Sequence, residues 1–134
     1  MNVVQESIVV NAAVADVYAR WMRFEDLPQF IKPMRNVQRI DDTHFSFTAG
    51  RDGHAHEGTV EVMFRNPERR IAWRMISTNV ELGVVSFEPQ MDGATEVTLK
   101  LRSAFNPLLS SESARQYLAD FKSLVEASPG NQRG

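Results

Sequence analysis

Two histidines separated by a single residue, His54 and His56, are the closest approach to a chemical motif in this chain. Imidazole nitrogens can transfer protons near neutral pH and can bind metal ions. Alternate residues of a strand share a face, so both rings could reach one ion, and they are in phase with Val60 and Val62. Zinc needs three or four ligands, however, and no third His or Cys lies nearby. We therefore predict no metal and no cofactor, and interpret the pair as histidines at the rim of a site.

Few other residues suggest catalysis. Arg51 and Asp52 precede the two histidines and form with them the polar cluster best placed for acid/base chemistry. Tyr18 and Tyr117 carry hydroxyls that could donate protons, although a tyrosine on a helix more often keeps its hydroxyl at the surface. There is no Ser/His/Asp order, phosphate-binding glycine loop or dinucleotide fingerprint. The catalytic residues stay unknown, with the two histidines and Tyr117 as candidates.

Composition excludes several classes of protein. The 134 residues have a net charge of -2 and no cysteine, so disulfides and thiolate metal sites are absent. No run of Lys or Arg exceeds a pair, which argues against a nucleic-acid partner. No signal peptide or membrane-spanning length is evident, so we expect a cytoplasmic protein without stable membrane insertion, either a monomer or a weak homodimer. We predict one domain over residues 1–127 and a disordered tail over residues 128–134.

The N-terminal third predicts a strand and two short helices. The segment VVQESIVV is rich in β-branched residues, and Asn11 could cap the helix that follows. That helix has one apolar face at helical spacing, and a second apolar set follows after a break. Pro28 fits the first turn of the second helix, and Pro33 ends it. The apolar positions are Val14, Val17, Tyr18 and Trp21, then Phe24, Leu27, Phe30 and Ile31.

The middle of the chain predicts antiparallel strands. A strand over about 34–40, a turn at 41–43 and the alternating segment HFSFTAG are followed by a turn at Asp52-Gly53. A long hairpin comes next, for which we expect a four-residue loop over 66–69. In this register Arg74 lies opposite Glu61 on the outer face, which favours a surface ion pair over a substrate clamp. The inward pairs are Phe64 with Ile71, Val62 with Trp73, and Val60 with Met75.

The last third predicts one more hairpin and a long helix. A turn at residues 91–93 would place Phe87 opposite Val97 and Val85 opposite Leu99, with Pro89 near the strand end. Ser110 or Ser111 then caps a helix with an apolar stripe. The stripe contains Ala114, Leu118, Phe121 and Val125, widened by Tyr117 and Leu124. The order of elements indicates an α+β fold in which a curved antiparallel sheet of six to seven strands wraps around the C-terminal helix.

These segments together resemble the START-like superfamily, also called SRPBCC or helix-grip proteins, and within it the polyketide cyclase/dehydrase-type subgroup. The resemblance covers about residues 3–125 and rests on packing and turn signatures. They are SIVVNAAVADVYARWMRFEDLPQF, RIDDTHFSF, RIAWRM, GVVSFEPQMDGATEVTL and YLADFKSLVE. Family members often carry Pro where this chain has Ala13 and Trp where it has Gly58, which changes the bulk on an inward strand position.

The resemblance implies a hydrophobic cavity between the sheet and the C-terminal helix, with the two proline-bent helices as a lid near its mouth. We expect a small hydrophobic ligand of lipid, quinone or polyketide type. The alternatives are a polyketide aromatase/cyclase or dehydratase using a histidine or Tyr117 as acid/base, and a quinone- or lipid-handling partner of another protein. The candidate ligand-binding residues are Trp21, Phe24, Leu27, Phe30, Phe45, Phe47, Trp73, Met75, Phe87, Leu118 and Phe121.

Overall fold

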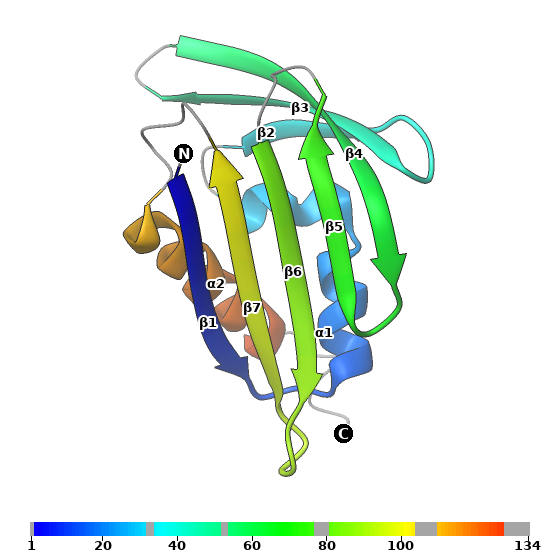
Figure 1. Cartoon of the computed structure of the whole chain (residues 1–134), viewed down its shortest axis with the longest axis vertical. Helices are drawn as coiled ribbons and strands as arrows, with labels where there is room; N and C mark the ends of the chain where they lie inside the picture. Colours follow the sequence, from blue (N-terminus) through cyan, green and yellow to red (C-terminus); the bar gives the residue numbers. More distant parts are fainter. Residues whose placement is uncertain (1, 32–33, 52–53, 77–80, 104–109, 128–134) are drawn as a thin grey trace.

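The computed structural model describes residues 2–31, 34–51, 54–76, 81–103 and 110–127. Seven antiparallel strands form one curved sheet in the order β1-β7-β6-β5-β4-β3-β2 (Figure 1). The strands are β1 (Asn2–Val10), β2 (Met34–Arg39), β3 (His44–Arg51), β4 (His54–Asn66), β5 (Arg70–Met75), β6 (Glu81–Pro89) and β7 (Thr95–Ser103). The helices are α1 (Val14–Trp21), the 3-10 helix η1 (Phe24–Gln29) and α2 (Ser111–Ala127). The predicted helix-grip arrangement is confirmed.

The helices cover one face of the sheet, which we call the inner face. In Figure 1 the sheet lies in front and the helices behind it. α2 packs mainly on β1, α1 on β6, and η1 on β2. Inward side chains alternate along the strands with outward polar ones, so that Val85, Phe87, Val97 and Leu99 are all buried. The hydrophobic core therefore lies between the inner face and the apolar stripes of the helices.

α2 shows the cap and the stripe that the sequence predicts. The Ser110 Oγ accepts a hydrogen bond from the Ser113 N–H at 3.0 Å, and the Ser113 Oγ accepts one from the Ser110 N–H at 3.0 Å. This reciprocal pair satisfies two backbone donors at the helix start. The stripe residues Ala114, Leu118, Phe121 and Val125 are all at most 1% exposed. Ser110 is therefore the cap, and the predicted buried face is confirmed.

The start of α1 differs from the prediction. Asn11 does not cap this helix, because Ala13 occupies the cap position and no side chain caps it. The Asn11 N–H instead donates to the Glu126 Oε2 at 2.8 Å, which ties the turn after β1 to the end of α2. The buried Thr95 hydroxyl donates to the Ala12 carbonyl oxygen at 2.8 Å. Tertiary hydrogen bonds thus fix this turn, and the helix begins two residues later than a cap at Asn11 would set it.

The second short helix is a 3-10 helix in which Pro28 is the fifth of six residues rather than part of the first turn. Glu25 and Asp26 do lie in the first turn, where the helix dipole favours negative charge. The Leu27 carbonyl oxygen accepts from both Phe30 and Ile31, at 3.1 and 2.7 Å, and this closes the helix. The predicted stop at Pro33 and the predicted turn at Asp52-Gly53 lie outside the described residues.

The β4–β5 hairpin confirms most of the predicted register. Val60 pairs with Met75, Glu61 with Arg74, and Val62 with Trp73. The Arg74 Nε lies 2.7 Å from the Glu61 Oε1, so the outward ion pair is confirmed as well.

One predicted pair of this hairpin is wrong. A bulge between Val62 and Phe64 makes Phe64 pair with Ala72 instead of Ile71. The bulge inserts Met63 as an extra residue, and Met63 and Phe64 are 49% and 50% exposed. The turn is also one residue shorter than predicted, covering 67–69, with Glu68 at a φ of 62°. The shorter turn and the bulge compensate each other, so the strand pairs on the far side of the bulge keep the predicted register.

The β6–β7 hairpin matches the prediction in full. Phe87 pairs with Val97 and Val85 with Leu99, and Pro89 ends β6. Gly93 has a φ of 87°, a conformation that few L residues adopt, and it allows the chain to turn there.

Candidate functional site

The inner face has two regions with different degrees of closure. In the first, which we call the aromatic core, the rings of Trp21, Phe30 and Phe121 contact one another. The centroid of Trp21 lies 5.0 Å from that of Phe30 and 4.9 Å from that of Phe121, and Phe30 and Phe121 are 4.9 Å apart. Phe30 and Phe121 are both 0% exposed. Side chains from α1, the end of η1 and α2 therefore close this region against water.

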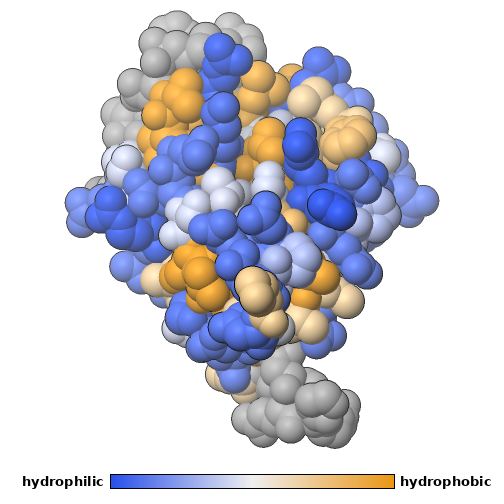
Figure 2. Space-filling view, turned by 60° about the horizontal axis from the view of Figure 1, so that its bottom comes forward, coloured by the Kyte–Doolittle hydropathy of each residue, from blue (hydrophilic) through white to orange (hydrophobic). Residues whose placement is uncertain are grey.

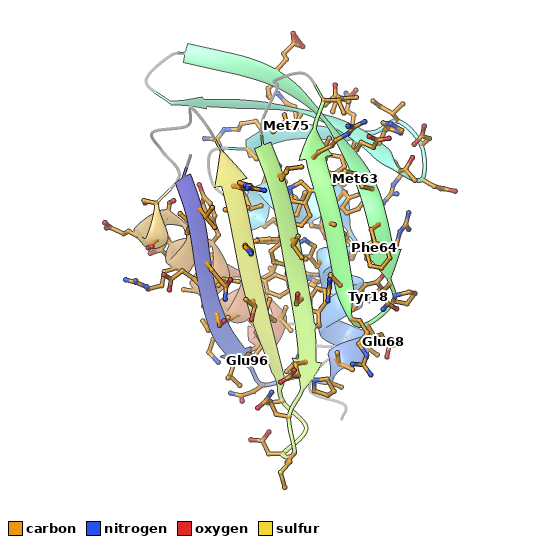
Figure 3. The ribbon with its side chains drawn as sticks, viewed as in Figure 1. Tyr18, Met63, Phe64, Glu68, Met75 and Glu96 are labelled. Carbon is orange, nitrogen blue, oxygen red and sulfur yellow. The ribbon has the colours of Figure 1, made fainter. Side chains whose placement is uncertain are left out.

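The second region, which we call the open end, consists of Phe47, Trp73, Met75 and Leu101. Trp73, Met75 and Leu101 point to the inner face yet stay partly accessible. Figure 3 shows Met75 toward the upper end of the sheet, where β5 ends. Trp73 connects the two regions, because its ring centroid lies 6.5 Å from that of Trp21. The open end is thus a continuation of the core along the inner face that the described helices cover less completely.

Two glycines shape the wall of the open end. Gly83 pairs with Trp73, and a Cβ at Gly83 would lie 2.3 Å from the Trp73 Cε2. Gly58 pairs with Phe47, and a Cβ there would lie 2.6 Å from the Phe47 Cζ and 3.0 Å from the Met75 Sδ. Each large side chain therefore lies across the bare backbone of the neighbouring strand. Phe47 therefore occupies the space at Gly58 where family members often carry Trp.

The structure places some of the predicted ligand-binding residues in each region and the others elsewhere in the hydrophobic core. Trp73 and Met75 are partly buried at the open end, and Phe47 is 8% exposed there. Phe30 lies wholly inside the aromatic core, which argues for a packing role and against the lid role that the two prolines suggest. Contact of these residues with a ligand stays a prediction. The remaining predicted residues are at most 5% exposed, namely Trp21, Phe24, Leu27, Phe45, Phe87, Leu118 and Phe121.

The candidate acid/base residues are only partly described. The strand positions of His54 and His56 opposite Arg51 and Ala49 are clear, but their side chains lie outside the described ones. Among the described residues, no three His, Asp or Glu side chains come together as metal ligands. Tyr117 is partly buried against the core on α2. The roles predicted for these residues stay predictions.

Tyr18 lies on the inner side as well. Its ring meets the ring of Phe87 edge-on at 5.6 Å. Burial raises the pKa of the Tyr18 hydroxyl, and the nearby Arg65 guanidinium only partly opposes this change. The phenol is therefore protonated at neutral pH and can donate a hydrogen bond to a bound group.

The third histidine of the chain belongs to a cluster that the sequence analysis missed. The His44 Nδ1 lies 2.9 Å from the Asp41 Oδ1, and its Nε2 lies 3.6 Å from the Glu61 Oε2. Hydrogen bonds from the Thr43 N–H and from His44 lower the pKa of Asp41 to about 2. The turn sequence Asp41-Asp42-Thr43 predicts the local contacts, but only the pairing of β3 with β4 brings Glu61 to His44. The cluster lies on the outer face, away from the open end.

Comparison with known proteins identifies the family. Residues 1–130 match the model of a family described as polyketide cyclase / dehydrase and lipid transport. The chain belongs to this family. Its sequence is 31% identical over 102 residues to an uncharacterised 17.2 kDa protein of Streptomyces lincolnensis, and the match covers 75% of this chain and 68% of that protein. The predicted cyclase/dehydrase-type assignment is therefore confirmed.

Solved structures show the same fold. A protein of Deinococcus radiodurans superimposes with a TM-score of 0.76 at 26% identity, over 92% of this chain and 95% of that one. A START superfamily protein from Mycobacterium smegmatis gives a TM-score of 0.74 at 16% identity, over 92% and 97% of the two chains. A di-domain aromatase/cyclase from the BE-7585A biosynthetic pathway gives 0.74 at 19%, with 94% of this chain covering 47% of that one. The START-like fold is thus confirmed.

None of the helices in the described part of the chain is long and apolar enough to cross a membrane. The cytoplasmic location and the monomeric or weakly dimeric state stay predictions.

Proposed function

We propose that this member of the polyketide cyclase / dehydrase and lipid transport family binds a small hydrophobic molecule, of lipid, quinone or polyketide type, at the open end. One observation carries the proposal. Trp73, Met75 and Leu101 are large apolar side chains that the strands direct inward, yet they stay partly accessible while their inward neighbours Ile71, Val85 and Leu99 are at most 2% exposed. Apolar surface that folding leaves accessible on an inward face gains free energy when a ligand covers it.

The chemistry of these side chains suits a flat or flexible apolar ligand. The Trp73 indole lies across Gly83, so one face of the ring is supported by backbone and the ring can act as a platform for a planar molecule. The Met75 side chain is unbranched and polarisable, so it can adapt to ligands of different outline. The flat Trp73 ring beside the flexible Met75 side chain therefore favours binding of a range of apolar molecules rather than one molecule of unique shape.

The test compares the same substitution at two methionines of different placement. Met75→Gln adds a polar amide to the open end, whereas Met63→Gln changes a methionine that is 49% exposed on the bulge of β4. We expect wild type to bind one naphthalene dye or fluorescent fatty acid with roughly micromolar affinity. Met75→Gln should weaken binding about tenfold, because one amide is left without partners when the ligand covers it. Met63→Gln should leave binding unchanged.

Two results would refute this site. If wild type binds no apolar probe, the proposed function is wrong. If both substitutions weaken probe binding equally, the probe does not bind at the open end. If wild type binds the probe, native mass spectrometry of the purified protein can detect a co-purified small molecule and so narrow the class of natural ligand.

A cyclase or dehydratase activity is the second candidate, and the partly buried position of Tyr117 on α2 favours it. A partly buried phenol can act as a general acid toward the carbonyl oxygen of a bound substrate. Tyr117→Phe should then lower turnover of an aromatic polyketide analogue while dye binding persists. Unchanged turnover in that variant would remove Tyr117 from the mechanism.

A further inference from the structure

A polar cavity of about 300 Å³ lies on the outer face of the sheet. It is formed where β5 begins, β6 ends and β7 begins, which is the lower end of the sheet in Figure 1. Figure 3 shows Glu96 toward this end and Met75 toward the other, so the cavity is separate from the open end. The residues that line it and carry the argument are Arg69, Arg70, Ser86, Glu88, Glu96 and Thr98.

The register arranges these side chains in two rows across the strands. In one row Arg70 pairs with Ser86, and Ser86 pairs with Thr98. In the next row Glu88 pairs with Glu96. Successive residues on one face of a strand are about 7 Å apart, so this spacing separates the two rows. One row thus presents a guanidinium and hydroxyls, and the other presents two carboxylates.

Arg69 adds a second positive charge beside the rows. Its carbonyl oxygen accepts a hydrogen bond from the Phe87 N–H at 2.8 Å, which attaches the end of the β4–β5 turn to β6. Arg69 is also one of the residues that line the cavity. The β4–β5 turn and the register of β5 on β6 therefore hold two arginines next to two glutamates.

The charges of this array do not compensate one another through direct contacts. Within the residues that the structure describes, no ion pair up to 4.0 Å includes Arg69, Arg70, Glu88 or Glu96. Glu88 and Glu96 lie directly opposite each other, and like charges at such positions repel. Elsewhere on the outer face the opposite arrangement occurs, since Glu61 pairs with Arg74 at 2.7 Å. The unpaired carboxylates and guanidinium groups are thus available to a bound molecule.

We infer that this cavity binds a small zwitterion that carries a cationic ammonium group at one end and an anionic phosphate or carboxylate at the other. Two carboxylates opposite each other accept hydrogen bonds from an ammonium group and relieve their repulsion. A guanidinium group binds phosphate or carboxylate through two parallel hydrogen bonds, and the Ser86 hydroxyl can add a third. The separation of the two rows, about 7 Å, suits one small molecule that carries both charges. A free amino-phosphate or amino acid and the headgroup of a zwitterionic lipid share this chemistry.

The experiment is an NMR titration of the full chain with three probes. Phosphoethanolamine carries both charges, whereas ethanolamine carries only the cation and inorganic phosphate only the anion. We expect phosphoethanolamine to bind at least about tenfold more tightly than either half, because it makes both sets of charge-assisted hydrogen bonds. The amide signals of Ser86, Glu96 and Thr98 should shift, and those of β2 and β3 should not.

Variants locate the binding site. Glu96→Gln and Arg70→Gln should each weaken phosphoethanolamine about tenfold, because each removes one charged partner. The matched controls are Glu57→Gln on β4 and Lys100→Gln on β7, which are exposed and do not line the cavity. Equal affinity for the three probes, or equal weakening by the controls, would overturn the inference.

The same variants distinguish the two sources of the zwitterion once binding of the soluble probe is measured. Vesicles of phosphatidylethanolamine that sediment with wild type and not with Glu96→Gln would assign a lipid headgroup. Vesicles that leave the protein in the supernatant would assign a free small molecule. Both results are consistent with the zwitterion site, and dye binding at the open end should be unaffected by Glu96→Gln in either case.

Discussion

The aromatic core and the open end both consist of large apolar side chains and lie on the same side of the sheet, yet only the first is closed to water. Trp21 is 3% exposed and Phe30 is 0% exposed, because side chains from three helical segments meet there. Trp73 and Met75 are strand residues that point toward the helices but stay partly accessible. Apolar character therefore does not distinguish the closed core from the open end in this fold. What distinguishes them is which element lies over the sheet at each point.

Charged residues on the outer face of the sheet also differ between its two ends. At one end of β5, Arg74 is paired with Glu61, whereas at the other end Arg70 lines a cavity beside two glutamates. Figure 2, which brings the lower end of the molecule forward, shows a largely hydrophilic surface with separate apolar patches. The Glu61–Arg74 pair is an ordinary surface ion pair, whereas the unpaired charges around the hollow are the basis of the proposed zwitterion site.

The largest expected effect tests the aromatic core. Phe30→Ala should lower the free energy of unfolding by about 3–5 kcal/mol, because it leaves a cavity between the rings of Trp21 and Phe121. The matched control is Phe64→Ala on the bulge of β4, which is 50% exposed and should cost about 1 kcal/mol or less. Urea unfolding measures both. Similar losses for the two variants would show that Phe30 packs loosely and would restore its role as a lid residue.

A second prediction compares two leucines on one strand. Leu99 is 2% exposed and Leu101 lies two residues further along the same face at the open end. Leu99→Ala should cost about 2–5 kcal/mol, whereas Leu101→Ala should cost about 1 kcal/mol because fewer contacts are lost. An apolar probe should raise the melting temperature of wild type and of Leu99→Ala, and raise that of Leu101→Ala less. Equal costs would remove the distinction between the two regions.

A third prediction concerns the wall of the open end. Gly83→Ala places a Cβ where the Trp73 indole now lies, so the ring must move, at a cost of about 1–3 kcal/mol. The indole N–H signal of Trp73 in an NMR spectrum should shift and probe affinity should change. Gly93→Ala is the control. No atom lies within 4 Å of a Cβ at that position, and only the φ of 87°, which disfavours alanine, makes the substitution costly. It should cost about 1 kcal/mol and leave the Trp73 signal in place.

The smallest effect lies outside both regions, at Asp41. The pKa of its carboxyl falls from 3.8 to about 2 in the folded chain, first through the hydrogen bond from the Thr43 N–H and then through the one from His44. Folding therefore favours the charged form. Its stabilising contribution is present above pH 3.8 and is lost as pH falls toward 2.

Asp41→Asn should remove this part of the pH dependence and leave probe binding unchanged. Carbon NMR of the Asp41 carboxyl group measures the pKa directly. A midpoint near 3.8 would show that the turn does not hold the carboxylate as the structure describes.

The sequence by itself determined the order of elements, the buried face of α2, and the register of both long hairpins except at one point. Period-2 and helical spacings report which residues share a face, and opposite charges at Glu61 and Arg74 exclude a shifted register. The predicted register failed between Met63 and the turn, because a bulge adds one residue and a shorter turn removes one, so only the pairs on the far side of the bulge still match. Alternation alone cannot locate two changes that cancel.

Only the tertiary structure decided what covers each face. Phe30 and Trp73 are both predicted as ligand-binding aromatic residues. Phe30 is closed off by Phe121 of α2, which begins far later in the chain, whereas Trp73 stays partly accessible. Arg70, Ser86 and Glu96 lie in three separate strands, so no local pattern brings them to one cavity. The physical reason is the same in both cases. Periodicity fixes the direction of a side chain relative to its own strand, whereas closure and charge pairing depend on elements that only folding brings into contact.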